Sequence, residues 1–195
     1  MIQKYVTRDC ILYTEKGNGA ATFNLALNEA LKYNDDEIIQ WWSPDPRCVL
    51  YPNNIKISKS MKSILRNQVF QFKMNENFDM MIESCSSVKR IGQDGTWIHD
   101  DMKKAYNNLH ALGVAMSAET YCNGELVGGL YGLKIGNVFF GESMFSLSTS
   151  ASKFAFVALS EWAAYEKLNM IDCQLYNPYL ASLGATLIGR AQFES

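Results

Sequence analysis

Between residues 114 and 146, apolar and polar side chains alternate along stretches that glycine-containing turns interrupt. Alternation predicts strands, because successive side chains of a strand point to opposite faces of the sheet. We therefore expect strands over 114–121, 126–134 and 138–146. The pairs Asn123-Gly124 and Gly136-Asn137 between them are typical of tight hairpin turns. The pattern predicts an antiparallel meander.

The segment that follows the meander combines a helical pattern with short apolar runs. We expect a helix over 152–167, a strand over 170–175, a short helix over 179–183 and a last strand over 186–188. A strand, a crossover helix and a parallel strand make a β–α–β unit. The meander is therefore expected to continue into such a unit.

The first 113 residues mix short helices and strands with proline-containing turns. Ser58 is a suitable N-cap, and the apolar spacing behind it is helical. We expect helices over 20–32, 58–66, 78–85 and 100–112, and strands over 37–42, 48–51 and 69–73. The sequence thus predicts an α+β protein of two domains: a small N-terminal α/β domain, residues 1–113, and a second domain, residues 114–195.

Composition is that of a folded protein, with 48% hydrophobic and 19% charged residues, which excludes a disordered chain. The net charge of −2 excludes a polycation, so any nucleic acid must contact a local patch. The cysteines and histidines are scattered without metal-ligand spacing, so we expect reduced thiols and no metal site. With no signal peptide and no bilayer-spanning apolar run, the sequence predicts a soluble cytoplasmic protein.

Polar side chains interrupt two of the expected strands. By strand periodicity, Glu142 and Met144 are expected to share one face, and so are Asp172 and Gln174. Asp172 and Gln174 are suited to holding and deprotonating an amine, or they are a polar pair that satisfies neighbouring turns. Glu142 is either a receptor for a cation or a carboxylate paired with Lys or Arg inside the protein.

A basic stripe and a pair of tryptophans each allow two interpretations. Lys56, Lys59, Lys62 and Arg66 recur every three or four residues, which on a helix makes one basic stripe. The stripe is either a contact for a phosphate backbone or the solvated face of an amphipathic helix. Trp41-Trp42 either wall a pocket or stack on a base, or form a buried aromatic plug, which the residues alone favour.

Taken together, a series of short motifs resembles the leucyl/phenylalanyl-tRNA–protein transferase family. The motifs keep the family's order from Trp41 to near the C-terminus. They are Trp41-Trp42-Ser43-Pro44-Asp45-Pro46-Arg47, Gly95-Thr96-Trp97-Ile98, Glu125-Leu126-Val127-Gly128-Gly129-Leu130-Tyr131-Gly132, Gly141-Glu142-Ser143-Met144-Phe145-Ser146, Ala151-Ser152-Lys153, Ile171-Asp172-Cys173-Gln174 and Leu180-Ala181-Ser182-Leu183-Gly184-Ala185.

The resemblance implies an enzyme that moves Leu or Phe, sometimes Met, from tRNA to the N-terminal Arg or Lys of a protein, marking it for N-end-rule degradation. It also implies an acyl-CoA N-acyltransferase-like (GNAT-like) fold for the C-terminal domain. Ser148 to Lys153 replace the phosphate loop of acetyltransferases, so acetyl-CoA is not expected, and no other cofactor is. Two other functions stay open: an aminoacyl-tRNA-dependent transferase with a different acceptor, and a non-catalytic relative that binds tRNA or N-terminal Arg or Lys.

The family's functional residues can be carried over where the motifs match. The resemblance implies that Gln174 contacts the attacking amine and that Asp172 polarises it as the ultimate base. It implies that Glu142 and Asn177 hold the basic end of the acceptor. The residues expected around the aminoacyl-adenosine end are Trp97, Tyr106, Leu130 and Met144, with Met144 lining the pocket for the amino acid.

Overall fold

The structure is a computed structural model that describes residues 44–88 and 98–194. The expected helix over 20–32, the expected strand over 37–42, the Trp41-Trp42 pair and Trp97 lie outside the described residues.

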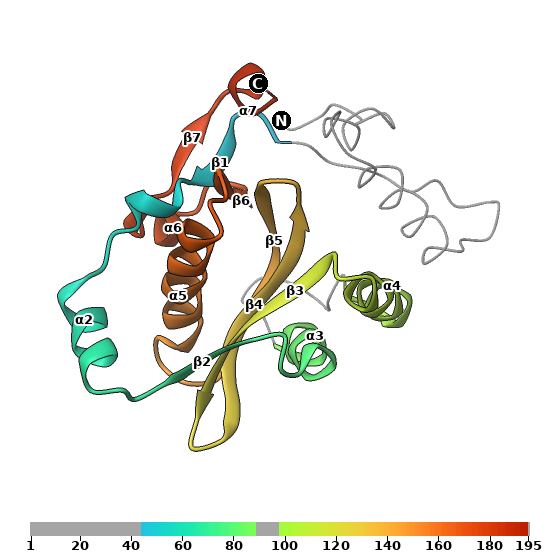
Figure 1. Cartoon of the computed structure of the whole chain (residues 1–195), viewed down its shortest axis with the longest axis vertical. Helices are drawn as coiled ribbons and strands as arrows, with labels where there is room; N and C mark the ends of the chain where they lie inside the picture. The colour runs from blue at the N-terminus through green and yellow to red at the C-terminus, as the bar shows by residue number, and fades with distance from the viewer. Residues whose placement is uncertain (1–43, 89–97, 195) are drawn as a thin grey trace.

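A single mixed sheet organises the described part of the chain, in the spatial order β2-β3-β4-β5-β6-β1-β7 (Figure 1). Its strands are β1 (Arg47–Leu50), β2 (Gln71–Met74), β3 (Ala115–Cys122), β4 (Glu125–Ile135), β5 (Val138–Ser146), β6 (Met170–Gln174) and β7 (Thr186–Ile188). Neighbours pair antiparallel except β5 and β6, which are parallel. The expected meander followed by a β–α–β unit is confirmed.

Helices cover both faces of this sheet. They are the 3-10 helix η2 (Pro52–Asn54), α2 (Lys59–Arg66), α3 (Phe78–Ser87), α4 (Asp100–Ala111), α5 (Ala151–Tyr165), α6 (Pro178–Ser182) and α7 (Arg190–Phe193). Helix α5 is the crossover between β5 and β6 and lies on one face, while α3 and α4 lie on the other (Figure 1). The α+β class is confirmed; α7 was not expected from the sequence.

Local chemistry explains where several elements begin and turn. The Ser58 hydroxyl accepts a hydrogen bond from the Met61 amide at 3.3 Å, so the expected N-cap of α2 is confirmed. The hairpin between β3 and β4 turns at Asn123 and Gly124, whose φ angles are +51° and +84°. Asn and Gly tolerate this left-handed region, which is why the pair specifies a tight turn.

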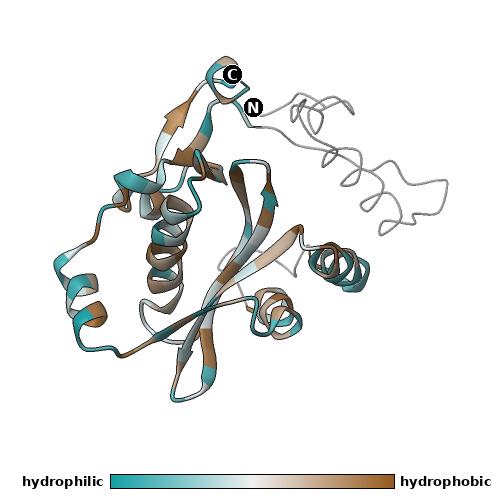
Figure 2. Ribbon diagram, in the orientation of Figure 1, coloured by the Kyte–Doolittle hydropathy of each residue, from teal (hydrophilic) through white to brown (hydrophobic). Residues whose placement is uncertain are grey.

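Side chains alternate between the two faces of the sheet, and each face carries a buried apolar cluster. Hydrophobic residues are interspersed with polar ones along the strands (Figure 2). Leu130 packs under α5 with Phe139, Phe156 and Leu159. Its neighbour Tyr131 belongs to the cluster beneath α3 and α4. Burial of these apolar faces is the main term that stabilises the sheet.

Two glycines of the motif in β4 are explained by close backbone approaches. At Gly129 φ is +154°, and a Cβ would lie 2.5 Å from the Ala118 carbonyl oxygen. A Cβ on Gly132 would lie 2.1 Å from the Phe140 carbonyl oxygen, at the bulge between β4 and β5. Gly132 therefore lies at the bulge in which Glu142 is the extra residue of β5.

The sheet crosses the expected boundary at residue 113. Strand β1 pairs with β6 and β7, and β2 pairs with β3, so strands from before and after the boundary share one sheet. The division into 1–113 and 114–195 stays a prediction. Among the described residues, no helix is long and apolar enough to cross a membrane.

Candidate active site

Strands β5 and β6 run together only briefly and then separate. Their ladder begins at Val138 and Met170 and ends at the pair Phe140 and Asp172, whereas β5 continues to Ser146. Beyond Asp172, both strands are irregular and carry polar side chains. The expected site residues Glu142, Asp172 and Gln174 all lie at this separation point.

Asp172 is completely buried and is fixed by three N–H groups. Arg47 donates from Nε to both carboxylate oxygens at 3.0 Å and from Nη2 to Oδ2 at 2.6 Å. The backbone N–H of Gln174 donates to Oδ1 at 2.9 Å. This charge-assisted, forked pairing offsets the cost of burying the carboxylate and fixes its orientation.

Gln174 stands at a bulge in β6. Val49 pairs with Asp172 and Cys48 with Gln174, so one residue of β6 is left over, and φ at Gln174 is +64°. The side-chain Nε2 of Gln174 donates to the carbonyl oxygen of Gly141 at 2.7 Å. The side chain therefore bridges the two strands where their ladder has ended.

Glu142 lies close to Asp172 and Gln174, on the side of the sheet that carries α4. Burial raises its pKa to about 7, and the negative charge of Asp172 also raises it. The Tyr106 hydroxyl, the Arg47 charge and the Gln174 amide act in the opposite direction. Burial and the Glu142 carboxylate raise the pKa of Tyr106 well above its usual value, so Tyr106 remains a hydrogen-bond donor.

The expectation that Glu142 and Met144 share a face is wrong. Tyr131 pairs with Ser143 and Gly132 with Gly141, so Glu142 is the extra residue of a bulge. The bulge breaks the two-residue period. Glu142 reaches Tyr106 of α4, whereas Met144 packs in the cluster beneath α5, where Leu130 is also buried. The expected site residues thus approach from both faces of the sheet.

Asn177 has a clear local task. Its Oδ1 accepts a hydrogen bond from the Tyr179 amide at 2.7 Å and caps the N-terminus of α6. The side-chain oxygen is therefore committed within the protein, and only the amide nitrogen remains to meet another group.

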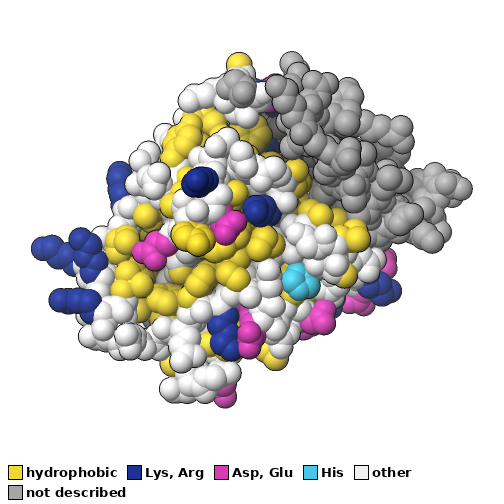
Figure 3. All heavy atoms as spheres, in the orientation of Figure 1, with side chains coloured by type: hydrophobic (Ala, Val, Ile, Leu, Met, Phe, Trp, Pro, Cys, Tyr) yellow, Lys and Arg dark blue, Asp and Glu magenta, His cyan; other side chains and the backbone are white. Residues whose placement is uncertain are grey.

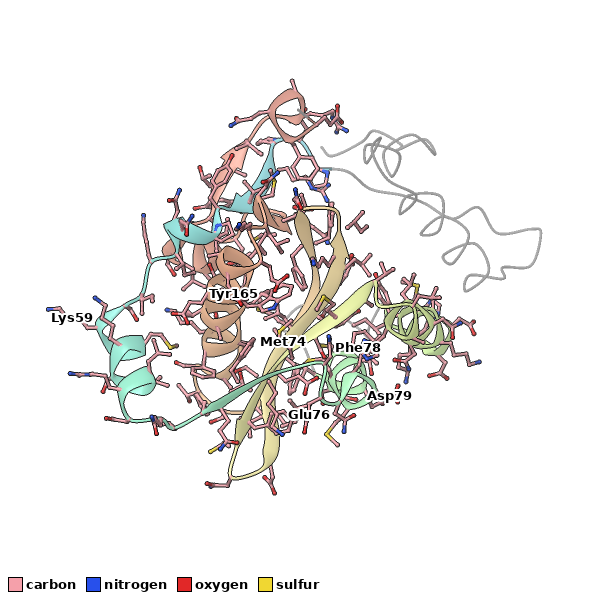
Figure 4. All side chains as sticks on the ribbon, in the orientation of Figure 1. Lys59, Met74, Glu76, Phe78, Asp79 and Tyr165 are labelled. Atoms are coloured by element: carbon pink, nitrogen blue, oxygen red, sulfur yellow. The ribbon has the colours of Figure 1, made fainter. Side chains whose placement is uncertain are left out.

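The expected basic stripe is partly wrong, because Lys56 precedes the N-cap Ser58 and does not lie on the helix. Lys59, Lys62 and Arg66 do lie on α2, and all four side chains are exposed. Figure 3 shows Lys and Arg side chains gathered at the edge of the molecule over α2, and Lys59 extends outward in Figure 4. Within residues 44–88 and 98–194, none of the four makes an ion pair with an acidic group.

Two features of the site were missed at the level of sequence. Arg47 lies far from Asp172 in the chain. The only sequence signal for a functional role of Arg47 was its place at the end of the Trp41–Arg47 motif. Cys48 and Cys173 lie against each other, and this thiol–thiol interaction lowers the pKa of Cys48 and raises that of Cys173. The described part of the chain holds no group of three His, Cys, Asp or Glu side chains that could bind a metal ion.

Comparison with known proteins agrees with the motifs. The sequence model of the family described as leucyl/phenylalanyl-tRNA protein transferase matches residues 49–195. A leucyl/phenylalanyl-tRNA–protein transferase of Flavobacterium johnsoniae is 48% identical over 163 residues, covering 84% of this chain and 77% of that protein. One from Christiangramia forsetii is 49% identical over 163 residues, covering 83% and 77%.

Solved structures are similar at a lower level. L-PGS from Bacillus licheniformis gives a TM-score of 0.47 at 10% identity, covering 70% of this chain and 47% of that one. A GCN5-related N-acetyltransferase from Kribbella flavida gives a TM-score of 0.42 at 8% identity, covering 75% and 55%. At these TM-scores, neither similarity carries an argument about this chain.

Proposed function

Since the chain belongs to the leucyl/phenylalanyl-tRNA protein transferase family and is an aminoacyltransferase acting on aminoacyl-tRNA and protein, we propose which substrates it takes and how its residues act. The donors are Leu and Phe esters of tRNA, and sometimes Met esters. The acceptors are proteins with N-terminal Arg or Lys, which the transfer marks for N-end-rule degradation in the cytoplasm.

The reaction needs neither a covalent nucleophile nor a metal ion supplied by the residues of this site. The α-amine of the acceptor forms a C–N bond with the ester carbonyl, and the C–O bond to the tRNA ribose breaks. One amine proton leaves the nitrogen, and the ribose oxygen gains one. Because the ester is already activated and an α-amine has a pKa near ~7.7–8.0, the protein's contribution is positioning and charge stabilisation.

Gln174 and Asp172 are the residues proposed to serve the amine. Because the Gln174 amide nitrogen donates to Gly141, its amide oxygen is the atom that can accept a hydrogen bond from the amine. The negative charge of Asp172 favours the positive charge that builds on the nitrogen as the bond forms. Since three N–H groups already donate to Asp172, we propose that it acts through this charge and through the backbone of Gln174.

Glu142 is the proposed receptor for the basic end of the acceptor. Its position is the single observation that carries this proposal. Glu142 is a carboxylate beside Gln174 and Asp172, and although the charge of Arg47 acts on it, burial and the Asp172 charge still raise its pKa to about 7. An arriving Arg or Lys side chain adds a positive charge that favours the ionised carboxylate. Asn177, whose oxygen caps α6, shapes the same end of the site through its backbone and amide nitrogen.

The donor's amino acid is proposed to contact the apolar cluster beneath α5. Leu130 and Met144 lie there with Phe156 and Leu159. Met144 is flexible and polarisable, which suits acceptance of both Leu and Phe. Tyr106 and Trp97 are proposed to approach the adenosine end, Tyr106 from its position beside Glu142.

The tRNA is proposed to contact Lys56, Lys59, Lys62 and Arg66, since these exposed charges are unopposed by nearby carboxylates within the described residues. Neutralised phosphates release counterions, so each contact adds about one unit to the salt slope of binding. A Lys59→Glu/Lys62→Glu variant should therefore flatten the dependence of tRNA affinity on salt by about two units. A Glu83→Lys variant on α3 serves as a charge-change control, and an unchanged slope in the α2 variant would indicate a merely solvated face.

Transfer of labelled Leu and Phe from charged tRNA to peptides that begin with Arg, Lys or Ala tests the proposal. We expect labelling of the Arg and Lys peptides only, and Glu142→Gln should remove the preference while Glu194→Gln, a surface control, retains it. Equal labelling of all peptides would indicate a different acceptor. Binding of charged tRNA without any transfer would indicate the non-catalytic alternative.

A further inference from the structure

The short helix α7 lies against the arginine that binds Asp172. The Arg47 guanidinium carbon lies 4.8 Å from the centre of the Phe193 ring, within cation–π distance. The same ring packs edge-on against Phe140, with centroids 6.5 Å apart and an interplanar angle of 83°. Phe140 is the β5 residue that pairs with Asp172.

Two further contacts hold α7 in this place. Strand β7, which leads into the helix, pairs with β1 so that Ile188 lies opposite Arg47. The backbone N–H of Arg190 donates to Asp45 Oδ1 at 3.2 Å, and Arg190 Nε lies 3.9 Å from Asp45 Oδ2. The start of β1 and the end of the described chain are therefore joined around Arg47.

The Arg47 guanidinium makes two different contacts. Nε and Nη2 donate to Asp172, and the guanidinium carbon lies over the Phe193 ring. The ring restricts rotation of the guanidinium about the ion pair, which keeps its donors aligned with both oxygens. Asp172 in turn accepts the backbone N–H of Gln174, at the residue with φ of +64°.

We propose that Phe193 is a positioning residue of the active site, acting through Arg47 on Asp172 and Gln174. This inference rests on the proposed function, because it assigns Phe193 to the residues that serve the acceptor amine. Phe193 itself touches none of the proposed reacting groups. Its ring selects the orientation of Arg47, which sets the orientation of the carboxylate and of the bulged residue that follows it.

The surroundings of Phe193 argue against a general role in folding. Helix α7 is four residues long and has no buried residue, and Phe193 is only partly buried and belongs to none of the buried core clusters. Replacing its ring is therefore expected to leave the sheet folded. A change in turnover without a change in unfolding midpoint would separate positioning from support of the fold.

The test measures single-turnover transfer at saturating charged tRNA, together with the acceptor KM and the unfolding midpoint. Phe193→Leu keeps an apolar side chain but removes the ring, and we expect the transfer rate to fall about three- to tenfold. Phe193→Tyr should restore the rate, because it keeps the ring. Glu194→Ala, at the C-cap of α7, is the control and should transfer at the original rate.

A double-mutant cycle identifies the route. Arg47→Lys removes the forked donor and should lower the rate about a hundredfold. If Phe193 acts through Arg47, adding Phe193→Leu to Arg47→Lys should cause almost no further loss, with the acceptor KM unchanged throughout. The inference is overturned if the losses from the two substitutions are fully additive, or if Phe193→Leu transfers at the original rate. Both results count only when Asp172→Ala still abolishes transfer. Failure of the proposed function is distinct: Asp172→Ala would then leave transfer intact.

Discussion

Within residues 44–88 and 98–194, two carboxylates are completely buried, Asp172 and Glu119, and they are stabilised in different ways. Neutral donors surround Glu119: the Ser117 and Tyr121 hydroxyls at 2.6 and 2.7 Å and the Asn77 amide at 3.0 Å. An arginine holds Asp172, and a second carboxylate, Glu142, lies nearby. Burial alone does not distinguish a structural carboxylate from a functional one.

The difference follows from what each network does. The Glu119 network joins β3 to the first turn of α3 and leaves its oxygens occupied by donors of the fold itself. Burial and the Glu119 bond raise the pKa of Tyr121, so this hydroxyl stays a donor. The Asp172 network instead lies where a ladder ends, beside a polar side chain that bridges the gap. Under the proposed function, it is the second network that serves the substrate amine.

Substitution of Asp172 should give the largest effect and the sharpest contrast. Asp172→Ala removes the charge beside Gln174, and we expect transfer to fall by about 10²–10⁴. The loss of Arg47's partner should also cost about 3–5 kcal/mol of unfolding free energy. Labelled-peptide assays on protein shown to be folded by circular dichroism check the first effect. Near-normal rates would remove Asp172 from the site.

Glu119→Gln is the matched change at the other buried carboxylate. It places an amide nitrogen against groups that are themselves donors, so the free energy of unfolding should fall by about 1–3 kcal/mol. Transfer per folded molecule should stay unchanged, since the network does not reach the site. Urea unfolding and the same transfer assay provide the two readouts. A large loss of specific activity in fully folded protein would contradict a purely structural role for Glu119.

The pH dependence of acceptor binding should report Glu142. Its pKa of about 7 means that the carboxylate becomes neutral as the pH falls through neutrality. From pH 8 to pH 6 the ionised fraction drops about tenfold, so KM for Arg and Lys peptides should rise about tenfold. Groups facing Glu142 are Tyr106, Asp172 and Arg47.

One control isolates this titration. In the Glu142→Gln variant the peptide amine still titrates, but the additional rise in KM should be lost. The ratio of the KM values of the two proteins at each pH therefore removes the contribution of the amine. Because folding raises this pKa, the stability contributed by Glu142 is present below about pH 4.5 and is lost as pH rises through about 7. An identical pH profile for both proteins would exclude Glu142 as the receptor.

Ser117→Ala should give the smallest effect. It removes one of several donors to Glu119, and the free energy of unfolding should fall by about 1 kcal/mol. The transfer rate should not change. Chemical unfolding measures the first value, with Ser86→Ala, whose hydroxyl bonds an exposed helix carbonyl, as a matched serine control. A loss in rate would connect the two buried networks.

Much of the local structure was predictable, because short-range physics dictates it. The Asn123-Gly124 turn, the Ser58 cap and the stop of α4 at Gly113, with φ of +74°, follow from side-chain chemistry within a few residues. The placement of Asp172 and Gln174 together on β6 was also expected. The α+β class followed from the same patterns.

Sequence periodicity could not predict which face several site residues take, because irregularities of the sheet determine it. A bulge at Glu142 separates it from Met144, and another at β6 turns Gln174, because one extra residue shifts every later side chain to the other face. The place of Lys56 outside α2, by contrast, already follows from the predictable Ser58 cap. Local patterns do not record where a ladder ends.

The sequence by itself determined the elements, the family and the identities of most candidate site residues, since these depend on neighbouring residues and on ordered motifs. Only the tertiary structure decided that Arg47 binds Asp172, that Tyr106 meets Glu142 and that Phe193 covers Arg47. These partners are separated by tens of residues along the chain. Their meeting depends on the strand order β5-β6-β1-β7, which arises from burial of two apolar faces against helices on either side.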